Sequence, residues 1–74
     1  MTNQAKAHRN HEEALDRFIG NVCRIREIAD AIRKAADDHF NTAPEDIHWG
    51  HVGTTSHYIE LLEEVLADVE RITK

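Results

Sequence analysis

The chain has 74 residues, of which 41% are hydrophobic and 31% charged, and it carries a formal net charge of −5. A chain this short forms one domain at most and buries too little apolar surface to be comfortably stable alone, and its single cysteine, Cys23, excludes a disulfide within one copy. No apolar run is long enough to span a membrane, and the opening residues, MTNQAKAHRN, lack the apolar core of a signal peptide, so we expect a cytoplasmic protein with no membrane partner.

The first predicted helix covers about residues 11–40. Thr2 or Asn3 can cap it early, but Asn10 followed by Glu13 has the spacing of a capping box and favours the later start. Apolar residues recur along it at alternating steps of three and four, the spacing of one helix face: Leu15, Phe18, Val22, Ile25, Ala29, Ile32 and Ala36.

Residues 41–45 are expected to end this helix and to begin a short one. Asn41 suits the left-handed position after a helix, and Pro44 cannot continue the helix before it. Thr42 and Glu45 have the spacing of a second capping box, with Pro44 in its first turn. This pattern predicts a short helix over residues 43–49, after the first helix has ended at Phe40, its last large apolar residue.

The short helix is expected to form a structured corner before the second long helix. Gly50 is predicted to end it, and Thr54 or Thr55 to cap the helix that follows. The only tryptophan, Trp49, lies in this corner. We expect its large apolar ring to plug the end of the helix pair, with the indole nitrogen bonded to a carbonyl.

The second predicted long helix covers residues 54–73. Its apolar stripe has the same steps as the first: Tyr58, Leu62, Val65, Val69 and Ile72. Its outer face is mostly acidic and includes Glu60, Glu63, Glu64 and Asp68. Like charges one turn apart destabilise an isolated helix by a few tenths of a kcal/mol per pair, so this cluster is either tolerated or used.

The net charge is confined to the second half of the sequence. Residues 1–40 hold seven basic and seven acidic residues, whereas residues 41–74 hold two basic and seven acidic ones. Direct binding to nucleic acid requires a basic surface, so the sequence argues against it. A basic protein partner suits this charge better.

The predicted fold is all-α: a long helix, a short helical corner and a second antiparallel helix, forming a helical hairpin in a single domain over residues 1–74. Its two broad apolar faces exceed what one partner helix can cover. The pattern therefore predicts a homodimer, most simply a four-helix bundle about a two-fold axis. Its shared core is expected to contain Val22, Ile25, Ile32, Leu62, Val65 and Val69.

His48 and His51 lie three residues apart in the corner, a spacing that two metal ligands on one helix can have. A zinc site needs three or four ligands, usually with thiolates or carboxylates. Cys23, the only thiol, is predicted to lie within the first helix, away from the corner. We therefore interpret both histidines as surface or capping residues and expect no metal and no cofactor.

Two patterns resemble enzyme motifs. Arg33 and His39, separated by five residues, resemble the Arg-x(4–6)-His signature of HEPN-type ribonucleases, helical dimers that pair such motifs across an interface. The acidic pairs at 13 and 16 and at 60 and 63 are similar to those that hold magnesium in all-helical nucleotide pyrophosphohydrolases. The acidic pairs fall on the outward helix faces, where solvated charge is the better interpretation. No phosphate loop, Ser/His/Asp set or activated cysteine is present, so an enzyme is not expected.

These observations favour a non-catalytic protein–protein interaction module, a small acidic helical dimer. The chain resembles, in size and charge, acidic proteins carried by phages and mobile elements, some of which block basic sites on host enzymes. The alternatives are a purely structural dimer and the HEPN-like ribonuclease using Arg33 and His39. The expected partner-binding residues are Glu60, Glu63, Glu64, Asp68, His48, Trp49 and His51.

Overall fold

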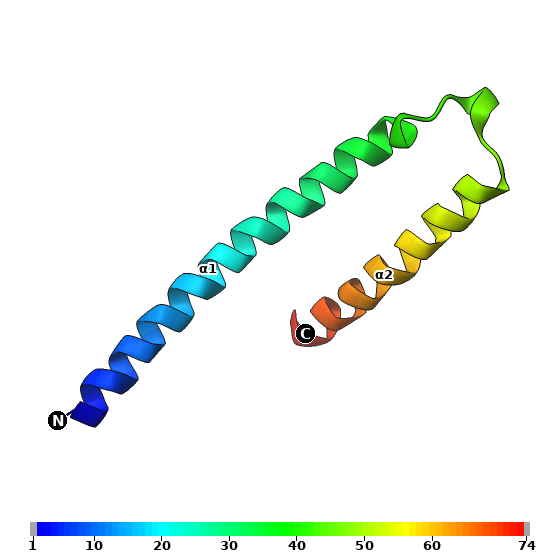
Figure 1. The fold of residues 1–74 in the computed structure, drawn as a ribbon. Helices are drawn as coiled ribbons and strands as arrows, with labels where there is room; N and C mark the ends of the chain where they lie inside the picture. Colours follow the sequence, from blue (N-terminus) through cyan, green and yellow to red (C-terminus); the bar gives the residue numbers. More distant parts are fainter. Residues whose placement is uncertain (1, 74) are drawn as a thin grey trace. The chain divides into compact units, whose positions relative to one another are not determined.

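The computed structural model describes residues 2–73, and their side chains from residue 8 onward. It contains the α-helix α1 (Thr2–Asp37), two 3-10 turns, η1 (His39–Asn41) and η2 (Pro44–Asp46), and the α-helix α2 (Trp49–Thr73), as Figure 1 shows. No strand occurs among residues 2–73. The all-α class and the helix–corner–helix order of a hairpin are therefore confirmed. The chain divides into two units between Asn41 and Thr42, and each is described by itself.

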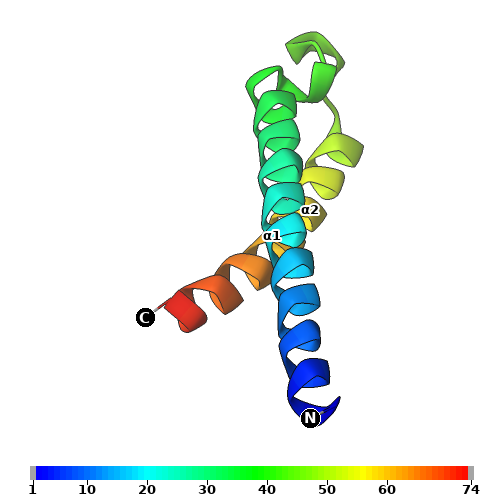
Figure 2. The same cartoon turned by 90° about the vertical axis from the view of Figure 1, so that its left-hand side faces the viewer.

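Helix α1 begins earlier than the predicted start near residue 11. It starts at Thr2 and continues through Asn10 without interruption, so its 36 residues extend over about 54 Å. Figure 2 shows α1 as one uninterrupted helix. The physical reason is propensity: residues 4–9 include glutamine, alanine, lysine and arginine, all good helix formers, and neither glycine nor proline. A possible cap at Asn10 does not stop a helix that its preceding residues favour.

Helix α1 also ends earlier than predicted, at Asp37 instead of Phe40. Three consecutive residues then take positive φ: His39 at 53°, Phe40 at 52° and Asn41 at 56°. The amide of Asn41 donates to the carbonyl of Asp38 at 3.0 Å, which closes the turn. The left-handed conformation predicted for Asn41 is confirmed, but it starts two residues earlier. Phe40 thus lies beyond the helix whose last apolar residue it was expected to be.

The predicted short helix over residues 43–49 is wrong. Only the single 3-10 turn at Pro44–Asp46 forms, with Ala43 and not Thr42 at its N-cap position. Pro44 occupies the first turn, as predicted. Ile47 then returns to extended backbone, with φ −71° and ψ 132°. This extended residue ends the turn, and His48 follows it as the residue before α2.

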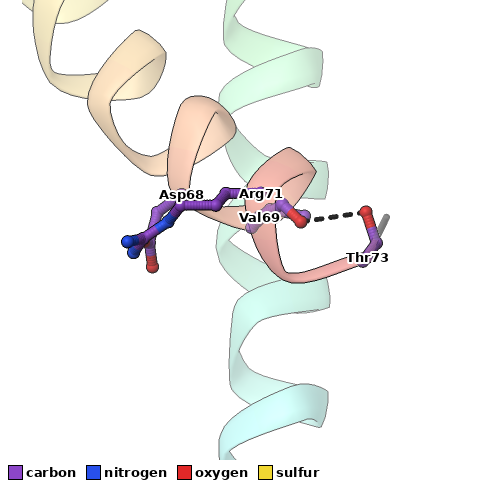
Figure 3. Close-up of polar contacts among 4 residues, drawn as sticks. All are labelled: Asp68, Val69, Arg71 and Thr73. Carbon is purple, nitrogen blue, oxygen red and sulfur yellow. Dashed lines mark hydrogen bonds and ion pairs between the residues drawn. The ribbon is translucent and has the colours of Figure 1, made fainter.

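Helix α2 starts at Trp49, five residues before the predicted start, and Gly50 lies inside it instead of ending a helix. The predicted caps Thr54 and Thr55 donate backwards to carbonyls of the preceding turn: Thr54 Oγ1 to Gly50 O at 3.0 Å and Thr55 Oγ1 to His51 O at 2.9 Å. Thr73 makes the same kind of bond to the Val69 carbonyl, at 2.9 Å (Figure 3). The hydroxyls of Thr54 and Thr55 therefore do not cap the start of α2.

The apolar stripes of both helices are open to solvent. No side chain between residues 8 and 73 is buried, and Phe18, Ile25 and Val65 are 64%, 63% and 61% exposed. The same holds, to differing degrees, for most of the residues expected to form the shared core. Within the described residues, neither helix combines enough length with enough apolar character to cross a membrane.

Candidate interaction surfaces

The acidic surface consists of Glu60, Glu63, Glu64 and Asp68 on α2. Residues 60, 64 and 68 are one turn apart from each other, so they follow one side of the helix, and residue 63 adjoins them. All four side chains are exposed. The helix itself therefore brings these predicted contact residues together on one exposed side of α2.

Only some of these four carboxylates lie close to a basic side chain. Asp68 forms an ion pair with Arg71 one turn further on, and Figure 3 shows the guanidinium turned towards the carboxylate. Glu60 lies 3.9 Å from His57 Nδ1, a contact that carries opposite charge only when the histidine is protonated. Among residues 8–73, no basic side chain pairs with Glu63 or Glu64. The centre of the acidic surface thus lacks a counter-charge within the described chain.

On α1, two arginines form ion pairs with carboxylates of the same helix. Arg24 pairs with Glu27 at 3.9 Å, and Arg33 pairs with Asp30 at 3.7 Å and with Asp37 at 3.6 Å. The two contacts of Arg33 bear on the ribonuclease resemblance, because they give this guanidinium a structural role on the surface of α1. His39, the other residue of that motif, lies after the helix end with positive φ. The ribonuclease alternative stays a prediction.

The start of α2 is held by a reciprocal pair of histidines. The Nδ1 atom of His48 accepts the amide of Gly50 at 3.0 Å, and Nδ1 of His51 accepts the amide of His48 at 3.1 Å. The carbonyl of His48 accepts the amides of His51 at 2.9 Å and Val52 at 3.3 Å. His48 is therefore the N-cap residue and His51 the third helical residue. Together they reproduce a capping box with imidazoles in place of the usual hydroxyl and carboxylate.

Gly50 makes room for this cap. A Cβ atom at this position would lie 2.6 Å from Cε1 and 2.9 Å from Nδ1 of His48. Cβ atoms in proteins essentially never lie within 3.0 Å of such side-chain atoms, so a residue with a Cβ at this position would displace the imidazole from the helix end. Gly53, one turn later, meets nothing within 4 Å. The two glycines of α2 thus differ in purpose, and only Gly50 serves the cap.

Trp49 does not plug the end of a helix pair as predicted. Its side chain is 85% exposed, and its neighbours Ile47 and Val52 are exposed as well. The reason is that α2 starts at Trp49, which places the indole on the first turn of a helix instead of inside a folded corner. The cap brings His48 and His51 together, with ring centroids 4.0 Å apart. Trp49 lies between them in sequence as an uncovered aromatic surface.

Within the described residues, no group of three His, Cys, Asp or Glu side chains is arranged to hold a metal ion. The Nδ1 atoms of His48 and His51 already accept hydrogen bonds. Cys23, which lies within α1 as predicted, is a free cysteine exposed in this structure.

The sequence signal for the cap was visible but unfamiliar. His48-x-x-His51 has the same i, i+3 spacing as Ser-x-x-Glu, and Gly50 lies between the two histidines. Imidazole is not among the favoured N-cap groups, so the nearby threonines were the predicted caps.

Comparisons with known proteins find no matching family model, no matching curated protein and no matching solved structure.

Proposed function

We propose that this chain is a non-catalytic protein-interaction module that forms a homodimer and uses its acidic surface to bind a basic partner protein. The exposed apolar stripes are the observation that carries the proposal. Between residues 8 and 73 the structure contains no buried side chain at all. A cytoplasmic location is part of the proposal, since an exposed free thiol such as Cys23 suits a reducing compartment.

The case for self-association is energetic. Isolated helices gain little stability in water from propensity alone, and most helices in proteins depend on packing of an apolar face. Burying a valine, leucine or isoleucine side chain contributes roughly 1.5–3 kcal/mol. Each helix carries several such residues exposed along one stripe, for example Ile25 on α1 and Val65 on α2. A second copy supplies a matching stripe without requiring any further gene product.

A four-helix bundle is the simplest assembly that covers these stripes. Two copies each contribute two helices with broad apolar faces, the arrangement that such bundles use. The charged residues of α1 and the acidic surface of α2 then remain outside. This proposal assigns the shared core to Val22, Ile25, Ile32, Leu62, Val65 and Val69.

The acidic surface is assigned to a basic partner because the carboxylates at its centre have no counter-charge among the described residues. Glu63 and Glu64 lack a basic partner among residues 8–73, and Glu60 faces only a histidine. Complementary charge accelerates association and selects among partners. The exposed indole of Trp49 adds an apolar aromatic side chain of the kind enriched at interaction sites.

Sedimentation velocity over a hundredfold range of protein concentration tests the dimer. The wild-type chain is expected to sediment as a dimer and to dissociate on dilution. Val65→Glu places a charge on the stripe and is expected to shift the chain to monomer. Ala67→Glu, which adds the same charge on the acidic side of α2, is the matched control and should remain dimeric. A wild-type monomer at every concentration contradicts the assembly.

A charge-reversal pair tests the acidic surface. In one variant Glu60, Glu63 and Glu64 are changed to lysine; in the other Glu12, Glu13 and Asp16 of α1 are, so that both change the net charge equally. Proteins captured from lysate by the wild type, in a manner that added salt weakens, should be lost from the first variant and kept by the second. Equal retention or equal loss would instead favour the purely structural dimer.

A further inference from the structure

The two hydrogen bonds that hold the start of α2 both require unprotonated nitrogen. The Nδ1 atoms of His48 and His51 act as acceptors for backbone amides, so each ring must carry its proton on Nε2. A protonated imidazole has N–H groups at both positions and can accept no hydrogen bond. Histidine is also the side chain that gains charge nearest to physiological pH.

We propose that the His48–His51 pair is a pH-responsive cap that sets where α2 begins. When both imidazoles are neutral, α2 starts at Trp49. When they are protonated, the first turn opens and the helix starts at Thr54 or Thr55. These threonines carry hydroxyls suited to an N-cap and, in the neutral form, bond backwards to carbonyls of the first turn. The switch thus moves Trp49 between helix and loop.

Three effects of protonation act in the same direction. The first is loss of both acceptors, which leaves the amides of His48 and Gly50 without the partners they have in this structure. The second is the helix dipole, whose positive end lies at the N-terminus and disfavours cations there. The third is mutual repulsion, since the ring centroids are 4.0 Å apart and two imidazolium rings at that separation carry like charge.

The neighbouring carboxylates act in the opposite direction. Glu45 and Asp46 of η2 are the nearest carboxylates before the cap in sequence, and their negative charge favours a protonated imidazole, which offsets part of the three effects above. After the cap, the next titratable group on α2 is His57, which lies 3.9 Å from Glu60. Protonation of His57 strengthens that contact. Acid is therefore expected to open the first turn of α2 while leaving the rest of the helix intact.

The sign of the pH effect follows from the acceptors. Because both Nδ1 atoms accept hydrogen bonds in the capped state, the cap contributes stability where both imidazoles are neutral. This contribution is lost as acid protonates the rings.

NMR secondary chemical shifts of the full chain at pH 8 and pH 5 test this cap. The Cα shifts of residues 49–53 are expected to be helical at pH 8 and to lose their helical character at pH 5. Those of residues 62–66 should stay helical at both and serve as the internal reference. Nitrogen shifts of the two imidazoles at pH 8 should show the Nε2–H tautomer. Helical shifts at residues 49–53 that persist at pH 5 would overturn the proposal.

Replacing the imidazoles by groups that cap without titrating isolates the cause. The double variant His48→Ser, His51→Gln keeps the capping-box chemistry and should retain helical shifts at residues 49–53 at both pH values. If it loses them at pH 5 as the wild type does, another group is responsible.

A glycine pair provides the second comparison. Gly50→Ala displaces the His48 ring and should lose most of the difference between pH 8 and pH 5. Gly53→Ala makes the same chemical change in open space and should keep the wild-type pH response. Equal responses in the two variants would contradict the role assigned to the ring of His48.

Discussion

The two helices differ in how their ends and charges are satisfied. Helix α1 runs from Thr2 to Asp37, pairs Arg24 and Arg33 with carboxylates one turn away and is followed by three left-handed residues. Helix α2 starts on a reciprocal histidine cap, and among residues 8–73 no basic side chain pairs with the centre of its acidic surface. The pairs that Arg24 and Arg33 form on α1 involve no histidine, whereas both partners in the cap of α2 are imidazoles. The arginine pairs of α1 do not depend on an imidazole, whereas the cap of α2 does, as does the contact between His8 and Glu12 near the start of α1.

The largest expected effect comes from placing a charge on either apolar stripe. It tests whether both helices contribute to one core. Ile25→Asp on α1 and Leu62→Asp on α2 should each lower the free energy of unfolding of the assembled protein by roughly 2–5 kcal/mol, because each places a charge in the proposed core. Urea denaturation at a fixed protein concentration measures this. A loss confined to one variant would show that only one helix lies in the core.

The next effect separates the two helix starts. His48→Ala together with His51→Ala should reduce the free energy of unfolding by about 0.5–2 kcal/mol at pH 8, the usual range for a lost N-cap, and by much less at pH 5. Thermal unfolding at both pH values measures the difference. His8→Ala on α1 is the control. His8 lies 3.0 Å from Glu12, a pair that protonation strengthens, so its effect should be larger at pH 5 than at pH 8.

Glycines inside the two helices offer a smaller effect with opposite sign. Gly20 in α1 and Gly53 in α2 both meet nothing within 4 Å where a Cβ would stand. Changing either to alanine should stabilise its helix by about 0.5–1 kcal/mol, since alanine restricts the unfolded chain and favours helix. The midpoint of thermal unfolding should rise in both. A fall in either would mean that another molecule approaches the backbone closely at that glycine.

The smallest effect concerns surface charge. Glu64→Lys converts two repulsive neighbours one turn apart, Glu60 and Asp68, into attractive ones, and should stabilise α2 by a few tenths of a kcal/mol per pair. Arg33→Glu should destabilise α1 by a similar amount, because it removes contacts to Asp30 and Asp37. Thermal midpoints in low salt measure both. Differences that survive high salt would have a cause other than charge.

The helical class and the two stripes could be predicted because they depend on periodicity over many residues. The spacing of apolar residues from Leu15 to Ala36, and from Tyr58 to Ile72, is typical of a helix and not of a strand. Helix ends depend instead on a few competing groups. At the start of α2, an imidazole pair beside Gly50 prevails over Thr54 and Thr55.

The candidate site was predictable to the same extent. The acidic surface follows directly from sequence spacing, so its residues lie together as expected. The histidines were expected to be surface or capping residues, and the structure shows capping. The exposure of Trp49 was missed because it depends on where α2 begins, and an error of five residues there reverses the environment of the indole.

Trp49 gives this protein an optical reporter of its own. It is the only tryptophan in the chain, its indole is 85% exposed, and it follows directly after the capping residue His48. Any molecule that settles over this end of α2 removes water from the sole indole, and its ultraviolet emission then shifts to shorter wavelength. Occupancy of the region is therefore readable by steady-state fluorescence without attaching a dye.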